Sequence, residues 1–308
     1  MVKIMKTKTT KLACAVATSA LLGAMFLAPA QAAFAKSWSF SEDSVSLGLK
    51  GVSPHVQKTS KGDRLWRSDM VPTGTAVTIC DNNGNCTQET FSTGSAGPVS
   101  DFTIAKAQSG WRAYFKSTDS TSQKIMSAPC TTDECLSFGT AVLTTTDMVV
   151  SKDQKAWGVP DAVTLPDGRV RIYIVESDMS SRTSCPESVA SYISSDGISF
   201  TKETGWRLTG GYVDTEILST KKNNWVMIVA DGPGCGGSKD SRKPQQLYIT
   251  TSKNGLKWAT PKVLTKTDAG RLDPTGYEVK ANTYRIYFAE GSITDNNYSI
   301  KRATLRLK

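Results

Sequence analysis

Histidine and long apolar stretches are scarce in this chain of 308 residues. It has one histidine, His55, and no CxxC pair, so a zinc site has few candidate ligands. Beyond about residue 35, no segment is apolar over the length that a transmembrane helix needs, so membrane insertion is not expected. No long stretch has helical periodicity. The basic residues are scattered and form no stripe, which argues against nucleic-acid binding.

The N-terminal segment has the features of a secretory signal peptide. A leader with four lysines precedes an apolar stretch over about residues 12–27, and two small-x-small cleavage sites follow it. We therefore expect residues 1–35 to be removed and residues 36–308 to form one secreted domain, extracellular or periplasmic. Cys14 raises the alternative of a lipoprotein, but it precedes most of the apolar region. Without this segment the net charge falls from +9 to +5, which is mildly basic.

Six cysteines remain after the signal peptide, an even number that predicts full pairing in an oxidising compartment. A metal site is the competing interpretation. Two pairs are close in sequence and each is expected to close its own hairpin, which leaves one pair between different repeats. The expected disulfides are Cys80–Cys86, Cys130–Cys135 and Cys185–Cys235.

From about residue 52 the chain repeats one pattern five times, which is typical of a closed or stacked repeat architecture. Each repeat has a short inner run, a polar turn and a strongly β-type run. A variable loop and a hairpin follow, and in two repeats Asp196-Gly197 and Asn254-Gly255 supply a tight turn. The inner runs are Val52-Ser53-Pro54-His55, Val99-Ser100-Asp101-Phe102, Val159-Pro160-Asp161-Ala162, Tyr212-Val213-Asp214-Thr215 and Arg271-Leu272-Asp273-Pro274.

The last repeat lacks a fourth strand, and residues 37–41 at the other end resemble the missing one. Pairing the two ends would close the ring and remove two exposed sheet edges. The sequence therefore predicts an all-β fold: a five-bladed β-propeller of four-stranded antiparallel blades, closed by the N-terminal strand in the last blade.

Polar residues of the inner runs are expected to surround the axis of this propeller. Asp101, Asp161, Asp214 and Asp273 are placed in one register, with His55 as the fifth member. The ends of the second strands share that face and add further polar residues, which are Asp69, Ser117, Glu176, Asp231 and Glu290. The Cys185–Cys235 bridge is expected at the rim of the same face.

Paired carboxyl groups in such a site can cleave glycosidic bonds, because crowding raises some of their pKa values. The alternative is that the aspartates accept backbone hydrogen bonds between blades.

Other candidates have both functional and structural interpretations. His55 could orient a substrate, and Arg271 could bind a carboxylate or form a simple ion pair. Trp157 and Trp206 could stack on a sugar ring or pack in the protein. Trp66, Trp111 and Trp225 are expected to pack between blades, and the Ser–Asp–Gly turns are expected to be structural.

The segment from Val159 to Tyr173 and the run Leu272-Asp273-Pro274 resemble the five-bladed propeller glycoside hydrolases, the clan of arabinanases, xylosidases and fructosidases. Residues 194–200 resemble the Asp-box hairpins of sialidases. The clan resemblance implies an inner-strand aspartate as base, a second aspartate as modulator and a glutamate as acid. Asp161 is then expected as base, with Asp101, Asp214 and Asp273 as modulators or acceptors of sugar hydroxyls. The matching inner positions hold no glutamate in register, and Glu216, two residues after Asp214 and on the same side of the strand, is the expected substitute for the acid. Glu176 and Glu290 are the next choices.

The sequence thus predicts a secreted, monomeric glycoside hydrolase-like propeller that acts on a poly- or oligosaccharide through carboxylates at the mouth of a central channel. A non-catalytic carbohydrate- or ligand-binding propeller is the alternative, and an interaction scaffold is a third. No cofactor is expected; a structural cation in the channel is the one ion considered.

Overall fold

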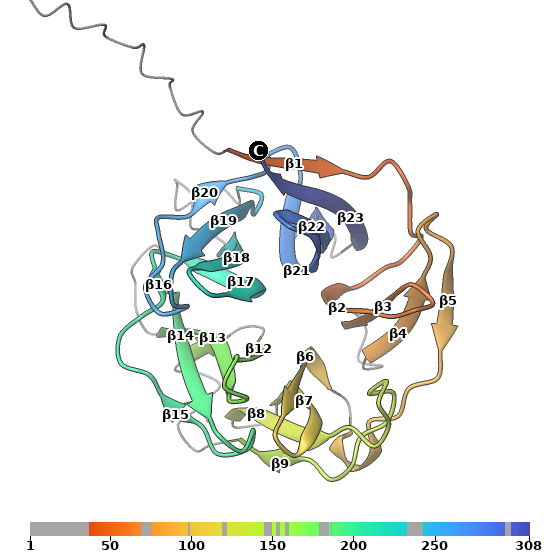
Figure 1. Ribbon diagram of the computed structural model, residues 1–308. Helices are drawn as coiled ribbons and strands as arrows, with labels where there is room; N and C mark the ends of the chain where they lie inside the picture. Colours follow the sequence, from red (N-terminus) through yellow and green to blue (C-terminus); the bar gives the residue numbers. More distant parts are fainter. Residues whose placement is uncertain are drawn as a thin grey trace, which may run out of the picture. The chain divides into compact units, whose positions relative to one another are not determined.

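The computed structural model describes residues 37–68, 75–97, 99–118, 122–144, 150–151, 155–157, 160–178, 185, 187–232, 243–292 and 297–308. Five antiparallel sheets stand around one axis as the blades of a propeller (Figure 1). The inner strands contact one another in a closed cycle, from β2 through β6, β12, β17 and β21 back to β2. The predicted five-bladed propeller is confirmed.

The blades follow one another in chain order. Blade 1 is β2 (Val52–Lys58), β3 (Asp63–Ser68), β4 (Thr75–Cys80) and β5 (Cys86–Glu89). Blade 2 is β6 (Ser100–Ala107), β7 (Gly110–Thr118), β8 (Ser122–Pro129), β9 (Val142–Leu143) and β10 (Val150–Ser151). Blade 3 is β11 (Lys155–Trp157), β12 (Asp161–Thr164), β13 (Val170–Asp178), β14 (Ser188–Ser194), β15 (Thr201–Lys202) and β16 (Leu208–Thr209). Blade 4 is β17 (Tyr212–Lys221), β18 (Asn224–Asp231), β19 (Leu247–Ser252) and β20 (Lys262–Val263).

Blade 5 takes strands from both ends of the described chain. Its inner three strands are β21 (Gly270–Lys280), β22 (Thr283–Ser292) and β23 (Asn297–Leu307), and β1 (Trp38–Glu42) pairs antiparallel with β23 as the outer strand. The rings of Trp38 and Phe40 lie 6.1 and 5.8 Å from those of Tyr284 and Phe288. The predicted closure of the ring by the N-terminal strand is therefore confirmed, and aromatic packing holds it.

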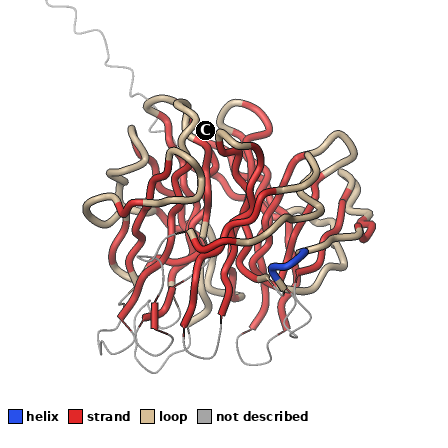
Figure 2. Tube along the Cα trace, turned by 90° about the horizontal axis from the view of Figure 1, so that it is seen from below, coloured by secondary structure: helices blue, strands red, loops and turns tan. Residues whose placement is uncertain are grey.

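In side view the strands run between the two faces, and the short 3-10 helix Gly94–Ala96 lies at the periphery (Figure 2). No helix in the described ranges is long and apolar enough to cross a membrane.

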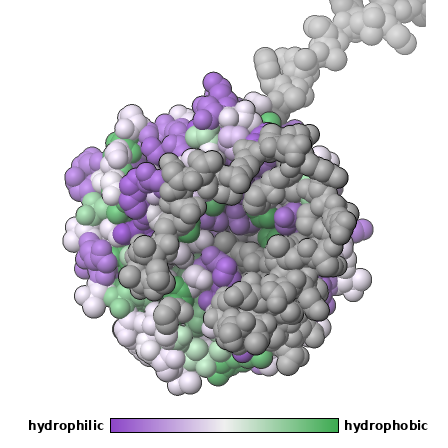
Figure 3. Space-filling model, turned by 180° about the vertical axis from the view of Figure 1, so that it is seen from behind, coloured by the Kyte–Doolittle hydropathy of each residue, from purple (hydrophilic) through white to green (hydrophobic). Residues whose placement is uncertain are grey.

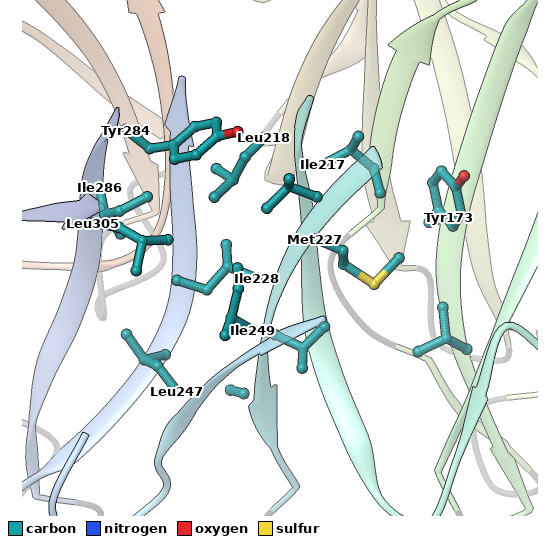
Figure 4. Close-up of a cluster of buried hydrophobic side chains, with 14 of the residues drawn as sticks. Tyr173, Ile217, Leu218, Met227, Ile228, Leu247, Ile249, Tyr284, Ile286 and Leu305 are labelled. Atoms are coloured by element: carbon teal, nitrogen blue, oxygen red, sulfur yellow. The ribbon is translucent and has the colours of Figure 1, made fainter. Parts of the chain in front are cut away.

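The hydrophobic core lies between adjacent blades, because the β-branched and aromatic residues of the second strands face their neighbours. In the largest cluster, Met227 and Ile228 of blade 4 lie between Tyr173 of blade 3 and Ile286 of blade 5, all fully buried (Figure 4). Burial of each such side chain contributes about 1.5–3 kcal/mol, so blade-to-blade packing supplies much of the stability.

The polar hairpin turns also join blades. Asp196 Oδ1 accepts hydrogen bonds from Ser194 Oγ and from the Ile198 and Ser199 N–H groups, which fixes the turn. Tyr114 of blade 2 then donates to the Gly197 carbonyl, 2.9 Å away. Tyr173 of blade 3 donates in the same way to Gly255 O in blade 4, at 2.8 Å. The structural role expected for these turns agrees with these contacts.

Two of the three expected disulfides are present. Cys80–Cys86 joins the ends of β4 and β5, and Cys130–Cys135 closes the loop after β8. Cys185 forms no disulfide with any described cysteine. Its expected partner, Cys235, lies outside the described residues, so that pairing stays a prediction.

The closure of blade 5 can be tested by removing one ring. We expect Phe40→Ala to lower the free energy of unfolding by about 2 kcal/mol, since Phe40 is half-buried against Phe288. Urea unfolding followed by tryptophan fluorescence measures this. Ser41→Ala, on the exposed side of β1, is the control and should change the midpoint little. Equal effects of both variants would show that this packing does not hold the ring together.

Candidate functional site

A β-bulge at the start of the inner strand places polar residues near the axis. In blades 1, 2, 4 and 5 the pairing with the second strand shifts at this point. The first bulge residues have positive φ angles of 47–52°, rare for residues other than glycine, and we call them the mouth ring: Ser53, Asp101, Asp214 and Asp273. The equivalent position in blade 3, residue 159, lies outside the described residues. Such backbone strain is concentrated at functional sites.

A second ring follows two residues further along each strand. Its members pair with equivalent positions of the second strands, and we call them the belt: His55, Thr103, Asp161, Glu216 and Thr275. The expected single register is therefore wrong for Asp161 and His55. Both belong to the belt, because His55 pairs with Trp66 and Asp161 pairs with Tyr173, at the level of the other belt residues. Glu216, expected to stand outside the register, shares the level of Asp161.

The members of the mouth ring contact one another across blades. Ser53 Oγ donates to Asp101 Oδ1 at 2.9 Å and lies 3.4 Å from Asp273 Oδ2, which also accepts the Ser53 N–H at 2.9 Å. The Asp273 N–H points to Asp214 Oδ2 at 3.5 Å, and the two carboxyl groups share a hydrogen bond. Lys116, from the second strand of blade 2, forms an ion pair of 2.5 Å with Asp101. The structure thus brings three predicted aspartates together.

Hydrogen bonds of the belt tie each blade to the next. At four of the five junctions, a belt side chain accepts the backbone N–H that directly follows the belt position of the next blade. The bonds are Ala162 N to Thr103 Oγ1 (3.3 Å), Ile217 N to Asp161 Oδ2 (2.7 Å), Gly276 N to Glu216 Oε1 (3.2 Å) and Val56 N to Thr275 Oγ1 (3.2 Å). The belt satisfies buried amides on the axis side of the inner strands, which have no sheet neighbour there.

Burial and crowding shift the protonation of the mouth ring. Burial, together with the Asp273 and Asp101 carboxylates, raises the pKa of Asp214 well above its usual range. Burial and the Asp101 carboxylate raise the pKa of Asp273 to about 6. Burial disfavours the charge of Lys116, but Asp101 outweighs it and the pKa of Lys116 is raised. The site therefore combines two carboxyl groups with raised pKa values, Asp214 and Asp273, with a carboxylate that is paired with Lys116.

A second carboxyl pair lies in the belt. Burial raises the pKa of Asp161 to about 7, and burial with the nearby Asp161 carboxylate raises the pKa of Glu216 well above its usual range. The two side chains share a hydrogen bond, and Thr275 Oγ1 lies 2.9 Å from Glu216 Oε1. Both residues are buried, with 3% and 8% of their surface exposed.

The residues expected at the ends of the second strands do not join these rings. Glu176 accepts from Tyr192 Oη at 2.5 Å and pairs with Lys202 at 2.6 Å, both on outer strands of its own blade. Asp231 accepts the Gln246 N–H, also within its blade. Asp69 lies outside the described residues.

Arg271 is two residues from Asp273 but binds other carboxylates. It pairs with Glu42 of β1 at 2.8 Å, with Asp268 at 2.7 Å and with Glu290 at 3.2 Å. Of the two interpretations of Arg271, the ion pair is therefore the one that the structure contains.

His55 lies in an aromatic cluster. Its ring is 5.8 Å from those of Trp66 and Phe102, and burial lowers its pKa to about 4. The imidazole is therefore neutral near pH 7. It fills the junction between blades 1 and 2 by packing.

The tryptophans divide into buried and exposed groups. Trp66 and Trp225 are buried, as expected for packing between blades, and Trp111 is partly buried. Trp206 has 48% of its surface exposed. The side chain of Trp157 lies outside the described residues.

Lys116, Ser53 and the belt threonines were missed from the sequence, although a signal for the register exists. Pro54, Pro160 and Pro274 occupy the same position in three blades, directly before the belt residue. Alignment on these prolines would have placed Asp161 beside Glu216.

Hydrophilic residues lie in a hollow at the centre of the face opposite to the view of Figure 1 (Figure 3). Polar surface at the centre of a propeller face agrees with the clustering of charged side chains around the axis.

The fold is similar to that of several solved glycoside hydrolases. A thermostable family-43 glycoside hydrolase superposes with a TM-score of 0.66 and 11% identity, over 87% of this chain and 96% of its own. An endo-arabinase from Bacteroides thetaiotaomicron gives 0.60 and 9%, over 88% and 97%. The GH62 alpha-L-arabinofuranosidase catalytic domain from Coprinopsis cinerea gives 0.57 and 10%, over 89% and 97%. The sequence matches no family model and no curated protein. At these identities the likeness shows the fold, and it confirms the resemblance at that level.

The hydrogen bonds of the belt can be tested with two matched threonines. We expect Thr275→Val to lower the free energy of unfolding by about 1–3 kcal/mol, because it leaves the buried Val56 N–H unpaired. Thr215→Val should be neutral or slightly stabilising, since Thr215 Oγ1 is buried without a hydrogen-bond partner among the described residues. Chemical denaturation measures both. A loss at Thr215 as large as at Thr275 would contradict the role of the belt.

The buried carboxyl pairs predict an inverse dependence of stability on pH. Their raised pKa values mean that the folded protein holds protons that the unfolded chain releases above about pH 4. The free energy of unfolding should therefore fall as the pH rises from 5 to 8. Glu216→Gln should flatten this slope, while Asp167→Asn, in an exposed turn, should leave it unchanged. Denaturation at pH 5, 6, 7 and 8 tests this; an unaltered slope in Glu216→Gln would contradict it.

Proposed function

We propose that the protein is a secreted hydrolase that acts on a glycan at the mouth ring. The observation that carries the proposal is the convergence of three aspartates from different blades there, with Asp214 beside Asp273 and Asp101 paired with Lys116 at 2.5 Å, while burial and the neighbouring carboxylates raise the pKa of Asp214 well above its usual range. Glycosidic bond cleavage needs one carboxyl group that donates a proton and a second that attacks or activates water.

Asp214 is the proposed acid, which protonates the leaving oxygen. Asp101 is the proposed base or nucleophile, and Asp273 receives the hydrogen bond of Asp214 and modulates its acidity. Lys116 keeps the charge of Asp101 compensated. These roles replace the pair implied by the sequence resemblance, because oxygens of Asp161 and Glu216 are held by backbone amides of the next blade.

The fold and the disulfides support the rest of the proposal. The similar solved structures include a xylanase, an endo-arabinase and an arabinofuranosidase, so a plant-type poly- or oligosaccharide is the first substrate class to test. Two disulfides agree with an oxidising compartment, and the basic and apolar N-terminal segment agrees with export. We keep the expectation of a monomer.

A non-catalytic glycan-binding propeller is the second candidate, favoured by how tightly the carboxyl groups are held together. Asp214 and Asp273 share a hydrogen bond, and Ser53 Oγ lies within 3.4 Å of both Asp101 and Asp273. Catalytic pairs in glycosidases are about 5–10 Å apart, and the hydrogen bond between Asp214 and Asp273 holds these two carboxyl groups closer than that.

The roles can be separated by four variants and a panel of xylan, arabinan and arabinoxylan. We expect Asp214→Asn and Asp101→Asn to reduce kcat at least about a hundredfold with little change in binding. Asp161→Asn and Glu216→Gln should retain most activity once their folding is confirmed by thermal unfolding. Full activity in Asp214→Asn would contradict the proposed acid. Binding without turnover by the wild type would favour the second candidate.

A further inference from the structure

One aromatic ring stands exposed on the outer rim of blade 3, away from the axis. Trp206 is the one aromatic residue among the large hydrophobic side chains that are exposed in the described ranges. It precedes β16, and β15 and β16 lie on the outer rim of the propeller (Figure 1). Its neighbours from Thr201 to Gly205 are polar or glycine and mostly exposed, so the ring is an apolar island in a polar surface.

The loop that carries Trp206 is fixed at both ends. The Glu203 N–H donates to Ser191 O at 2.9 Å, and the Arg207 N–H donates to Val189 O at 2.7 Å. Gly205, with a φ of 81°, allows the tight turn between these bonds. The backbone therefore presents the ring at the apex of a short bulge on the edge of β14.

The Arg207 side chain makes this presentation rigid. Its guanidinium is buried and donates to the carbonyls of Thr204 and Gly205 within the loop, and to Leu256 O of blade 4 at 3.2 Å. Its Nε is buried without a partner among the described residues, which is unfavourable. The chain thus bears a cost to hold an exposed ring in one place.

Charged groups beside the ring are also held in position. Lys202 Nζ lies 4.9 Å from the centre of the Trp206 ring and 2.6 Å from Glu176 Oε2. Tyr192 in turn donates to Glu176 Oε1. The ammonium group is therefore placed beside the ring by a carboxylate that is itself fixed, with further hydrogen-bonding capacity toward solvent.

We propose that Trp206, with Lys202 and Glu176, forms a second glycan-binding site on the wall of blade 3. A sugar residue of a polysaccharide stacks its C–H face on the indole, and Lys202 donates to its hydroxyl oxygens. A single ring among polar residues suits one or two sugar units, because a protein partner needs about 800 Å² of surface per side. The site is separate from the mouth ring and would hold a polymer whether or not that ring cleaves it.

Affinity electrophoresis in gels with soluble arabinoxylan or arabinan tests this site. We expect Trp206→Ala to weaken retardation, with Kd raised about tenfold, and Trp206→Phe to retain part of the binding. Thermal unfolding should be unchanged, since the ring lies outside the core. Val263→Ala removes another exposed apolar side chain, 57% exposed, and is the matched control that should bind as the wild type does.

The same gels with Asp214→Asn separate this site from the proposed hydrolase. We expect Asp214→Asn to keep its retardation and Trp206→Ala to show weakened retardation. Turnover of short oligosaccharides should be unaffected in Trp206→Ala. Wild-type retardation in Trp206→Ala would overturn the proposal, and so would a wild type that no polysaccharide retards. Loss of hydrolysis alone would bear only on the mouth ring.

Discussion

The propeller depends on hydrogen bonds that run from one blade to the next around the belt. The inner strand has a sheet neighbour on one side only, so the backbone N–H directly after the belt position has no partner in its own sheet. The belt residue of the preceding blade accepts that N–H at four of the five junctions. His55 packs against Phe102 at the fifth. In blades 1, 2, 4 and 5 the bulge just before the belt position carries the mouth ring, so the hydrogen bonds between blades and the candidate site lie on the same stretch of the inner strand.

The hydrogen bonds between neighbouring blades do not require carboxyl groups in the belt. At Thr103 and Thr275 a neutral hydroxyl accepts the same bond that Asp161 and Glu216 accept. Burying two carboxyl groups in contact raises their pKa values, and their ionisation is unfavourable in the folded state. The mouth ring repeats this arrangement with Asp214 and Asp273, so two levels of the axis each hold a hydrogen-bonded carboxyl pair.

The fold could be predicted from the sequence because its signals are local and repeated. The structure has strands where the sequence has β-type runs, including residues 37–41, and a turn at Asp196-Gly197. The register of Asp161 could not be predicted by matching aspartates, because in blades 2, 4 and 5 a bulge puts the aspartate two residues before the belt position. The role of Lys116 was equally hidden. It comes from a second strand, and only the three-dimensional pairing of Ser100 with Lys116 brings it to Asp101.

The outer strand of the last blade has a consequence for the order of events in folding. In β1 and β23, Trp38 pairs with Leu307 and Glu42 pairs with Ala303. This pairing therefore joins segments from opposite ends of the described chain. Contacts of such sequence separation form late and slowly, because a long loop must close before they contribute. Until the final strand is available, an incomplete ring has two unpaired edges. Pairing of β1 with β23 is therefore expected as the last step of ring formation.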